Sequence, residues 1–353
     1  MHQHKDVTPI PRLERILVIR LSSLGDVLLT TPVLRLLREH CPAAQIDFLT
    51  KVDYQDLLCA NPCVDRLLLF EPRQGFQQTL RTLRQTCYDV IVDLHRTWRS
   101  CLLLHGLVAR RKLTYTKHTV RRALLVHLGW NTLQAMTPVP ELYAAPLRRL
   151  GITAPLPPLE MHLTAASREA MRTYLRQAFP ERAACPLLAV APGARWPTKR
   201  WPVERFAAVA QEMAQAQRAV VVLLGGAEDV SLAQELSRRL RVPVLDSTGQ
   251  LSLRHTAALL EQCRLLLSND SGLMHMATAL RVPVVAIFGP TVQEFGFYPF
   301  RACAQVVSAE VACRPCSTKG STRCPRRHHH CMQQVTVAQV CAAAHTMWKG
   351  SEA

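Results

Sequence analysis

The sequence lacks any apolar run long enough to cross a membrane. A spanning helix needs about 20 apolar residues, and no stretch of this 353-residue chain reaches about 18. Residues 1–12 contain no apolar core of a secretory signal either. We therefore expect the protein to stay in the cytoplasm. Hydrophobic residues make up 48% and charged residues 20%, which is typical of a globular protein and excludes a disordered one.

Several ligand-binding and structural signatures are also missing. Neither the Gly-x-Gly-x-x-Gly fingerprint nor the Gly-x-x-x-x-Gly-Lys-[Ser/Thr] loop occurs, so the usual phosphate-binding motifs are excluded. The thirteen cysteines are odd in number and accompany no export signal, which argues against a disulfide framework. No RNA- or DNA-binding signature is present, and we expect no nucleic-acid partner.

The whole chain has a formal net charge of +17, and residues 95–139 contain no acidic residue. A positive excess of this size favours anionic partners. Leu, Val and Trp are interleaved with the basic residues, which leaves two interpretations: a solvated basic face, or a surface that meets anionic lipid head groups, where each basic residue contributes about 1 kcal/mol. The basic residues of this segment are Arg96, Arg99, Arg110, Arg111, Lys112, Lys117, Arg121 and Arg122.

Short β-rich runs alternate with helical patterns along both halves of the chain. Strands are predicted at 15–20, 46–50, 64–70, 89–94, 187–191, 219–224, 242–245, 265–268 and 283–288, and helices at 27–40, 203–217 and 229–240. The alternation predicts βαβ units with parallel sheets. A Pro-rich stretch at 154–158 separates the halves. We expect an α/β protein with two Rossmann-like domains facing a central cleft, residues 1–160 and 161–353. The last helix is free to pack back on the first domain.

The first candidate site is the loop from Ser22 to Asp26, which follows the first strand and opens the first helix. Open α/β sheets bind ligands at such strand ends. Gly25 permits a tight turn close to a ligand. Two interpretations of Asp26 remain open, a helix cap and a general base.

The second half contains three further strand-end segments. The loop 191–202 crowds Arg195, Lys199 and Arg200, which would suit a diphosphate or form a solvated basic loop. Residues 268–275 begin a helix whose first amides could bind an anion. Glu228, in the segment 225–229, could accept hydrogen bonds from ribose hydroxyls or simply lie at a helix start.

A cysteine cluster near the C-terminus combines Cys313, Cys316, Cys324 and Cys331 with histidines 328–330. These are ligand types that zinc and iron accept, but the spacing matches no standard finger. The alternatives are a bound metal and plain reduced cysteines.

Together these segments resemble glycosyltransferase family 9, the ADP-heptose:lipopolysaccharide heptosyltransferases. The resemblance rests on RLSSLGDVLLTTP (Arg20–Pro32), APGARWPTKRWP (Ala191–Pro202), GGAED (Gly225–Asp229) and NDSGLMHMATAL with PVVAIFGPT (Asn269–Thr291). It covers roughly residues 15–340, and the segment CRPC…CPRRHHHCM is most similar to heptosyltransferase II relatives.

The resemblance implies a GT-B fold, with the acceptor bound by the first domain and the nucleotide by the second. It implies that Asp26 is the catalytic base, Lys199 the contact to the donor diphosphate and Glu228 the acid near the ribose. Donor contacts are further expected at Arg195, Arg200, Asp270, Ser271, Gly272 and His275. Acceptor contacts are expected at Ser22, Ser23, Arg96 and Arg99, although this chain has Asp93-Leu94-His95 where family members often have Asp-Leu-Gln.

The implied activity is inverting transfer of a heptose from ADP-heptose to the inner core of lipopolysaccharide, a Kdo/heptose–lipid A acceptor, with no cofactor required. The partners would be ADP-heptose and a phosphorylated acceptor at the inner membrane face, where the enzyme would be peripheral. Three alternatives remain: transfer of a heptose or another sugar to a protein or a different glycan, epimerisation of a nucleotide sugar, and nucleotide-sugar binding without turnover. The sequence leaves the oligomeric state open.

Overall fold

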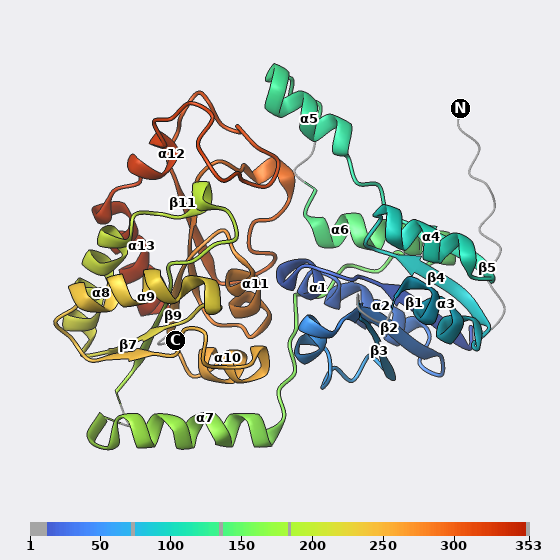
Figure 1. Cartoon of the computed structure of the whole chain (residues 1–353), viewed down its shortest axis with the longest axis horizontal. Helices are drawn as coiled ribbons and strands as arrows, with labels where there is room; N and C mark the ends of the chain where they lie inside the picture. The colour runs from blue at the N-terminus through green and yellow to red at the C-terminus, as the bar shows by residue number, and fades with distance from the viewer. Residues whose placement is uncertain (1–12, 72–74, 134–136, 183–184, 351–353) are drawn as a thin grey trace. The chain divides into compact units, whose positions relative to one another are not determined.

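The computed structural model describes residues 13–71, 75–133, 137–182 and 185–350, and the chain forms two compact units (Figure 1). The first unit comprises residues 1–117 and 138–162, and the second comprises 118–137 and 163–353. Residues 1–12, in which the sequence shows no signal segment, lie outside the described part. No helix of the described residues is long and apolar enough to span a membrane.

The first unit is a five-stranded parallel sheet in the order β3-β2-β1-β4-β5. Side chains of α3 and α4 share a core with its strands. The direction in which successive strands are added to the sheet reverses between β1 and β4. These two strands end side by side, since Ile19 pairs with Asp93. The strands and helices are β1 (Arg15–Ile19), α1 (Leu24–Leu28), α2 (Thr31–His40), β2 (Gln45–Lys51), β3 (Arg66–Phe70), α3 (Phe76–Arg84), β4 (Tyr88–Asp93), α4 (Trp98–Gly106), β5 (Ala109–Thr114) and α6 (Val139–Ala144).

The single helix predicted at 27–40 is wrong, because the chain forms α1 and α2 with a break between them. Pro32 lies in the first turn of α2, where its missing N–H costs no hydrogen bond. The hydroxyls of Thr30 and Thr31 donate to the carbonyls of Val27 and Leu28 at 2.6 and 2.8 Å, which satisfies acceptors at the end of α1. The short α1 therefore ends close to the strand-end loop that begins it.

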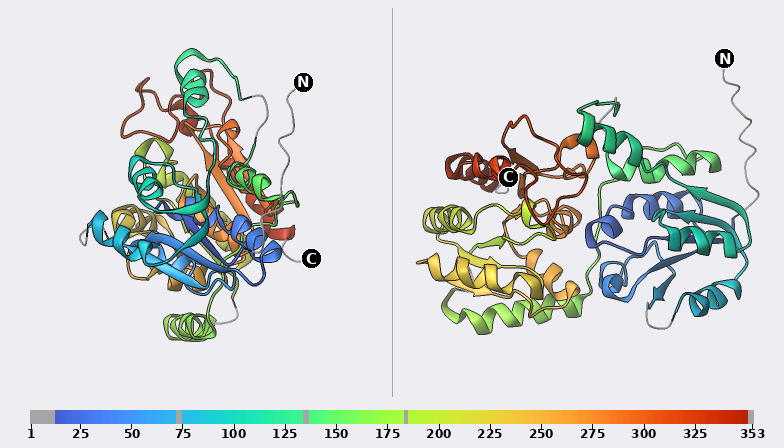
Figure 2. Two further views of the ribbon diagram at one scale, coloured as in Figure 1. Left: turned by 90° about the vertical axis from the view of Figure 1, so that its right-hand side faces the viewer. Right: turned by 45° about the horizontal axis from the view of Figure 1, so that its top comes forward.

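The second unit is a six-stranded parallel sheet in the order β11-β10-β9-β6-β7-β8 (Figure 2). Strands β6, β9 and β10 are buried along their whole length, as expected for parallel strands covered on both faces. The strands and helices are α5 (Thr119–Leu128), α7 (Ala165–Ala178), β6 (Leu187–Ala191), α8 (Val203–Gln217), β7 (Val220–Leu223), α9 (Val230–Arg239), β8 (Val244–Asp246), α10 (Leu253–Leu260), β9 (Leu265–Asn269), α11 (Gly272–Ala279), β10 (Val284–Phe288), β11 (Ala304–Ser308), α12 (His330–Gln333) and α13 (Val337–Gly350).

Two helices of the second unit, α5 and α13, were not assigned to it with certainty from the order of the sequence. Helix α5 comes from the first half of the chain, yet Arg122 donates to the Phe295 carbonyl at 2.9 Å and lies over the rings of Phe295 and Phe297. The last helix, α13, shares the core of the second unit with α8. Its buried residues there are Val340, Cys341, Ala343, Ala344, Met347 and Trp348.

Candidate active site

In the first unit, Asp26 lies at the carboxyl end of β1, in the first turn of α1. Ser23 is the N-cap residue of that helix. Its backbone N–H and its hydroxyl donate to Asp26 Oδ2 at 3.2 and 2.8 Å. One carboxylate oxygen therefore closes the helix start, as a capping acid does.

The other oxygen of Asp26 is held by two side chains from outside the Ser22–Asp26 loop, Arg20 and Tyr143. Arg20 Nη2 lies 2.7 Å from Asp26 Oδ1, and the Tyr143 hydroxyl donates to the same oxygen at 3.3 Å. Arg20 is itself buried, donates to the carbonyls of Ser22 and Leu94, and lies over the Tyr143 ring. Because the Arg20 guanidinium is fixed by backbone acceptors, it fixes the orientation of the carboxylate in turn.

The charge of Arg20 controls the ionisation of Asp26. Burial opposes the charged carboxylate, but the nearby guanidinium and the hydrogen bonds from Ser23 outweigh it and hold the pKa of Asp26 below its ordinary value. Asp26 is therefore ionised at neutral pH. Pairing keeps the base ready to accept a proton, but it also makes Asp26 a weaker base than a free carboxylate.

The predicted acceptor residues have different neighbours. Ser22 offers its carbonyl to Arg20, and Ser23 caps α1. Arg96 donates to the Tyr115 carbonyl at 2.8 Å, while the exposed Arg99 lies over the ring of Trp98. The structure thus gathers Ser22 and Ser23 at Asp26, and no contact between Asp26 and Arg96 or Arg99 is found among the described residues.

His95 adds a titratable group near this ion pair. Burial, followed by the positive charge of Arg20, lowers the pKa of His95 to about 4. His95 is therefore neutral at physiological pH and can donate or accept one hydrogen bond there. The family resemblance singled this position out only as a departure from the family pattern.

In the second unit, Lys199 and Asp270 meet although they come from different motifs. Lys199 Nζ lies 2.5 Å from Asp270 Oδ2, and both side chains are largely buried. The Thr291 hydroxyl donates to the same oxygen at 2.7 Å. An ammonium has three donors, so Lys199 has N–H groups left for a phosphate after its contact with Asp270.

Neighbouring loops hold the Lys199 segment in place. Asn269 Oδ1 accepts from the Trp201 N–H at 3.0 Å, and Asn269 Nδ2 donates to the Pro192 carbonyl at 2.8 Å. Thr198 and Ser321 are joined by reciprocal hydrogen bonds of 2.8 and 2.9 Å. The 191–202 loop is therefore fixed both by the end of β9 and by the cysteine-containing segment.

The remaining donor candidates lie at the same sheet edge with different exposure. Ser271 is the N-cap of α11 and its hydroxyl lies 3.0 Å from that of Ser268, Gly272 is the first helical residue, and His275 is buried one turn further on. Arg195 is exposed and lies over the Trp196 ring, and Glu228 is exposed beside the end of β7.

Asp229, not predicted as a site residue, is the buried acid beside Glu228. Arg200 Nη2 lies 3.7 Å from Asp229 Oδ1, and the Gly226 N–H donates to Asp229 Oδ2 at 3.2 Å. A Cβ on Gly193 would lie 2.2 Å from this carboxylate, so only glycine fits there. Burial raises the pKa of Asp229 above its ordinary value.

The cysteines near the C-terminus lie close enough to influence one another's pKa values, but they are not arranged as a metal site. Burial, followed by the nearby cysteines, raises the pKa of Cys316, and burial followed by Cys316 raises the pKa of Cys331 to about 11. Cys313 Sγ lies 3.9 Å from His328 Nε2. Within the described ranges, no group of three or more His, Cys, Asp or Glu side chains is arranged to hold a metal. The structure therefore does not assemble Cys313, Cys316, Cys324 and Cys331 into the metal site that the sequence left open.

Two doubly wound parallel sheets, each with polar groups at the carboxyl ends of its strands, match the architecture of the GT-B class of glycosyltransferase fold. Solved structures agree. The chain matches the Escherichia coli ADP-heptose lps heptosyltransferase II with a TM-score of 0.76 and 23% identity, over 96% of this chain and 100% of that one. It matches the E. coli heptosyltransferase WaaC with ADP-2-deoxy-2-fluoro heptose with a TM-score of 0.65 and 20% identity, over 94% and 99%.

The model of glycosyltransferase family 9 (heptosyltransferase) matches residues 77–325, and the chain belongs to this family. Among curated relatives, it is 27% identical over 281 residues to lipopolysaccharide heptosyltransferase 3 of E. coli K12, covering 76% of this chain and 80% of the relative. It is 28% identical over 335 residues to lipopolysaccharide heptosyltransferase 1 of Pseudomonas aeruginosa PAO1, covering 88% of each. The fold and family that the motifs predicted are confirmed, and the chain is a glycosyltransferase.

Proposed function

We propose that this chain transfers a heptose, with inversion, from ADP-heptose to a hydroxyl of the inner core of lipopolysaccharide. The observation that carries the proposal is the meeting of Lys199 with the turn that begins α11, at the carboxyl ends of β6 and β9. The names of the curated relatives, and the heptose-bearing donor analogue with which WaaC was solved, support this donor and this acceptor.

The second unit binds the donor in this proposal. Lys199 and Arg200, with the exposed Arg195 able to swing in, stabilise the negative charge that develops on the departing diphosphate. The first amides of α11, after Ser271, donate to a phosphate oxygen, and Glu228 accepts from a ribose hydroxyl. Because side chains supply the positive charge, the reaction needs no metal cofactor.

The first unit binds the acceptor and supplies the base. An acceptor hydroxyl attacks the anomeric carbon of the donor while the bond to the ADP oxygen breaks and its electron pair leaves with ADP. Asp26 takes the proton of that hydroxyl. Arg20 and Tyr143 hold the carboxylate in place, and Ser22, Ser23, Arg96 and Arg99 contact the acidic acceptor.

The test is incubation of the purified chain with ADP-heptose and truncated core acceptors, followed by mass spectrometry of the products. We expect a mass increase of one heptose on a Kdo-containing lipid A acceptor, also when a chelator is present. Heptose on a protein substrate instead would show a different acceptor. Tight ADP-heptose binding without any product would show a binding protein, and loss of product with the chelator would show a metal requirement.

We also propose that the chain works at an anionic membrane surface. In the first unit Trp98 is 68% and Val108 89% exposed, and the basic Arg99, Arg110 and Lys112 lie near them in the chain and are exposed. Exposed aromatic and apolar side chains beside cations suit the head-group region of a membrane.

The test is co-sedimentation with phosphatidylglycerol vesicles at low salt. We expect the chain to pellet with the vesicles, and we expect the double variant Trp98→Ser with Val108→Ser to reduce the pelleted fraction several-fold. Equal binding to phosphatidylcholine vesicles would contradict the electrostatic part.

A further inference from the structure

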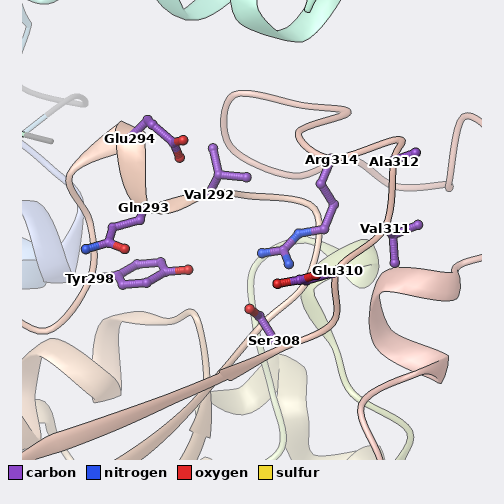
Figure 3. Close-up of a pocket in the computed structure, with 9 residues that line it drawn as sticks. All are labelled: Val292, Gln293, Glu294, Tyr298, Ser308, Glu310, Val311, Ala312 and Arg314. Atoms are coloured by element: carbon purple, nitrogen blue, oxygen red, sulfur yellow. The ribbon is translucent and has the colours of Figure 1, made fainter. Parts of the chain in front are cut away.

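A pocket of about 480 Å³ with a mixed polar and apolar lining lies in the second unit, at the carboxyl ends of β10 and β11 (Figure 3). Its volume falls in the range of small-molecule sites, roughly 300–1,000 Å³. Of its lining residues only Arg314, in the CRPC segment, belongs to a segment on which the family resemblance rests. The polar residues that line it are Gln293, Glu294, Tyr298, Ser308, Glu310 and Arg314.

Arg314 connects this pocket to the proposed donor turn. Its Nη2 donates to the Thr291 carbonyl at 2.8 Å, and Nη1 donates to the Ala309 carbonyl. The Thr291 hydroxyl donates to Asp270, which pairs with Lys199. The pocket therefore begins one residue beyond Thr291, beside the group that would bind the diphosphate.

The charge of the pocket disfavours a second phosphate site. Two carboxylates, Glu294 and Glu310, line the pocket together with one guanidinium, that of Arg314. This guanidinium is already shared among two backbone carbonyls and the Tyr298 hydroxyl. In Figure 3 the Glu310 carboxylate, the Ser308 hydroxyl and the Tyr298 hydroxyl all point toward the Arg314 head group. A phosphate would meet two like charges here, whereas sugar hydroxyls can donate to the carboxylates.

We infer that this pocket is a saccharide subsite that takes one neutral, hydroxyl-rich sugar unit. Carboxylate, amide and hydroxyl groups supply both acceptors and donors, which matches a ring of hydroxyls. Val292, Val311 and Ala312 supply the apolar wall that a sugar's C–H face requires. The inference rests on the proposed function only in the source of the sugar, which is either the heptose of the donor or a sugar of the acceptor.

The experiment measures binding to the full-length chain by calorimetry, with ADP, ADP-heptose and a deacylated core oligosaccharide as probes. Glu310→Gln removes the negative charge and replaces one acceptor oxygen by an NH2 donor at nearly constant volume, and Tyr298→Phe removes only the hydroxyl. Glu235→Gln, on the exposed side of α9 where Glu235 pairs with Arg239, is the matched control. For Glu310→Gln we expect about a ten-fold weaker affinity for the sugar-bearing probe, with ADP affinity unchanged.

The outcomes distinguish the sources. Weaker ADP-heptose binding alone supports the donor's heptose as occupant, and weaker oligosaccharide binding alone supports an acceptor sugar. Unchanged binding of both probes in both variants would overturn the proposed subsite. Displacement of the oligosaccharide by methylammonium would also overturn it, because it would show that the pocket binds a cation. A wild-type chain that binds the oligosaccharide through this pocket but transfers no heptose would support the subsite and reject the proposed function.

Discussion

Each of the two units has a largely buried ion pair at the carboxyl ends of its strands, but the proposed functional group is an anion in the first unit and a cation in the second. In the first, the carboxylate of Asp26 is paired with Arg20; in the second, the ammonium of Lys199 is paired with Asp270. In both, the proposed functional group is the more exposed member, with side-chain exposures of 22% against 7% and 14% against 8%. The deeper partner fixes the orientation of the outer one. In the first unit, the pairing lowers the pKa of Asp26 and so makes it a weaker base.

The change expected to affect activity most is Asp26→Asn, which removes the proposed base from the first site. We expect turnover to fall about 10³-fold, within the usual range for general-base catalysis. The affinity for ADP-heptose should stay unchanged, because the donor binds in the second unit. Steady-state kinetics with a truncated core acceptor, together with calorimetry for ADP-heptose, measures both quantities.

The control for this experiment must separate chemistry from folding. Asp26→Asn leaves the buried Arg20 without its counter-charge, and breaking a buried pair costs about 3–5 kcal/mol. The double variant Arg20→Met with Asp26→Asn should regain part of that stability and stay inactive. Asp53→Asn, an exposed carboxylate of the same unit, is the matched substitution. Near-normal turnover in Asp26→Asn would leave Asp26 with only its capping role.

Lys199→Met applies the same test to the second site and should have a smaller effect. Loss of the cation should weaken both ADP and ADP-heptose binding about 10²-fold, because one charged contact to a phosphate contributes about 1.5–3 kcal/mol. Fluorescence or calorimetric titration with each nucleotide measures this directly. Lys349→Met, on the exposed face of α13, is the control. A loss of turnover with no loss of nucleotide affinity would assign Lys199 to the transition state alone.

Much of the fold followed from the sequence because its strands are short, apolar and regularly spaced. All nine predicted strands are present. The two further strands of the described residues, β5 and β11, each lie at one edge of their sheet. Strand β5 (Ala109–Thr114) contains three consecutive basic residues and carries no continuous apolar run, since one side of an edge strand is open to solvent.

The site was predictable only as far as local motifs reach. Asp26, Lys199 and Asp270 could be placed at strand ends, because parallel strands end at one edge of a sheet. The Tyr143 partner of Asp26 could not be predicted, because it lies 117 residues from Asp26 in the chain and no spacing rule joins them. Arg20 did leave a signal, as a charged residue directly after the apolar run ILVI (residues 16–19).

The smallest effect that we expect concerns the pH dependence of stability, through His95. This histidine lies near the Arg20–Asp26 pair, and none of the described contacts of Lys199 involves a histidine. The pKa of His95 falls from 6.5 to about 4 in the folded chain. The folded state therefore binds the proton less well than the unfolded one between these values. Stability from this group is complete above pH 6.5 and is lost as the pH falls toward 4, by at most about 3 kcal/mol.

His95→Gln should remove this pH dependence by replacing the titrating ring with a neutral amide. Urea unfolding of the full-length chain at intervals from pH 7.5 to 4.5, followed for wild type and variant, should give a flatter stability curve for the variant. His105→Gln, an exposed histidine on α4, should follow the wild type. Parallel curves for His95→Gln and the wild type would show that the imidazole is solvated and does not sense the charge of Arg20.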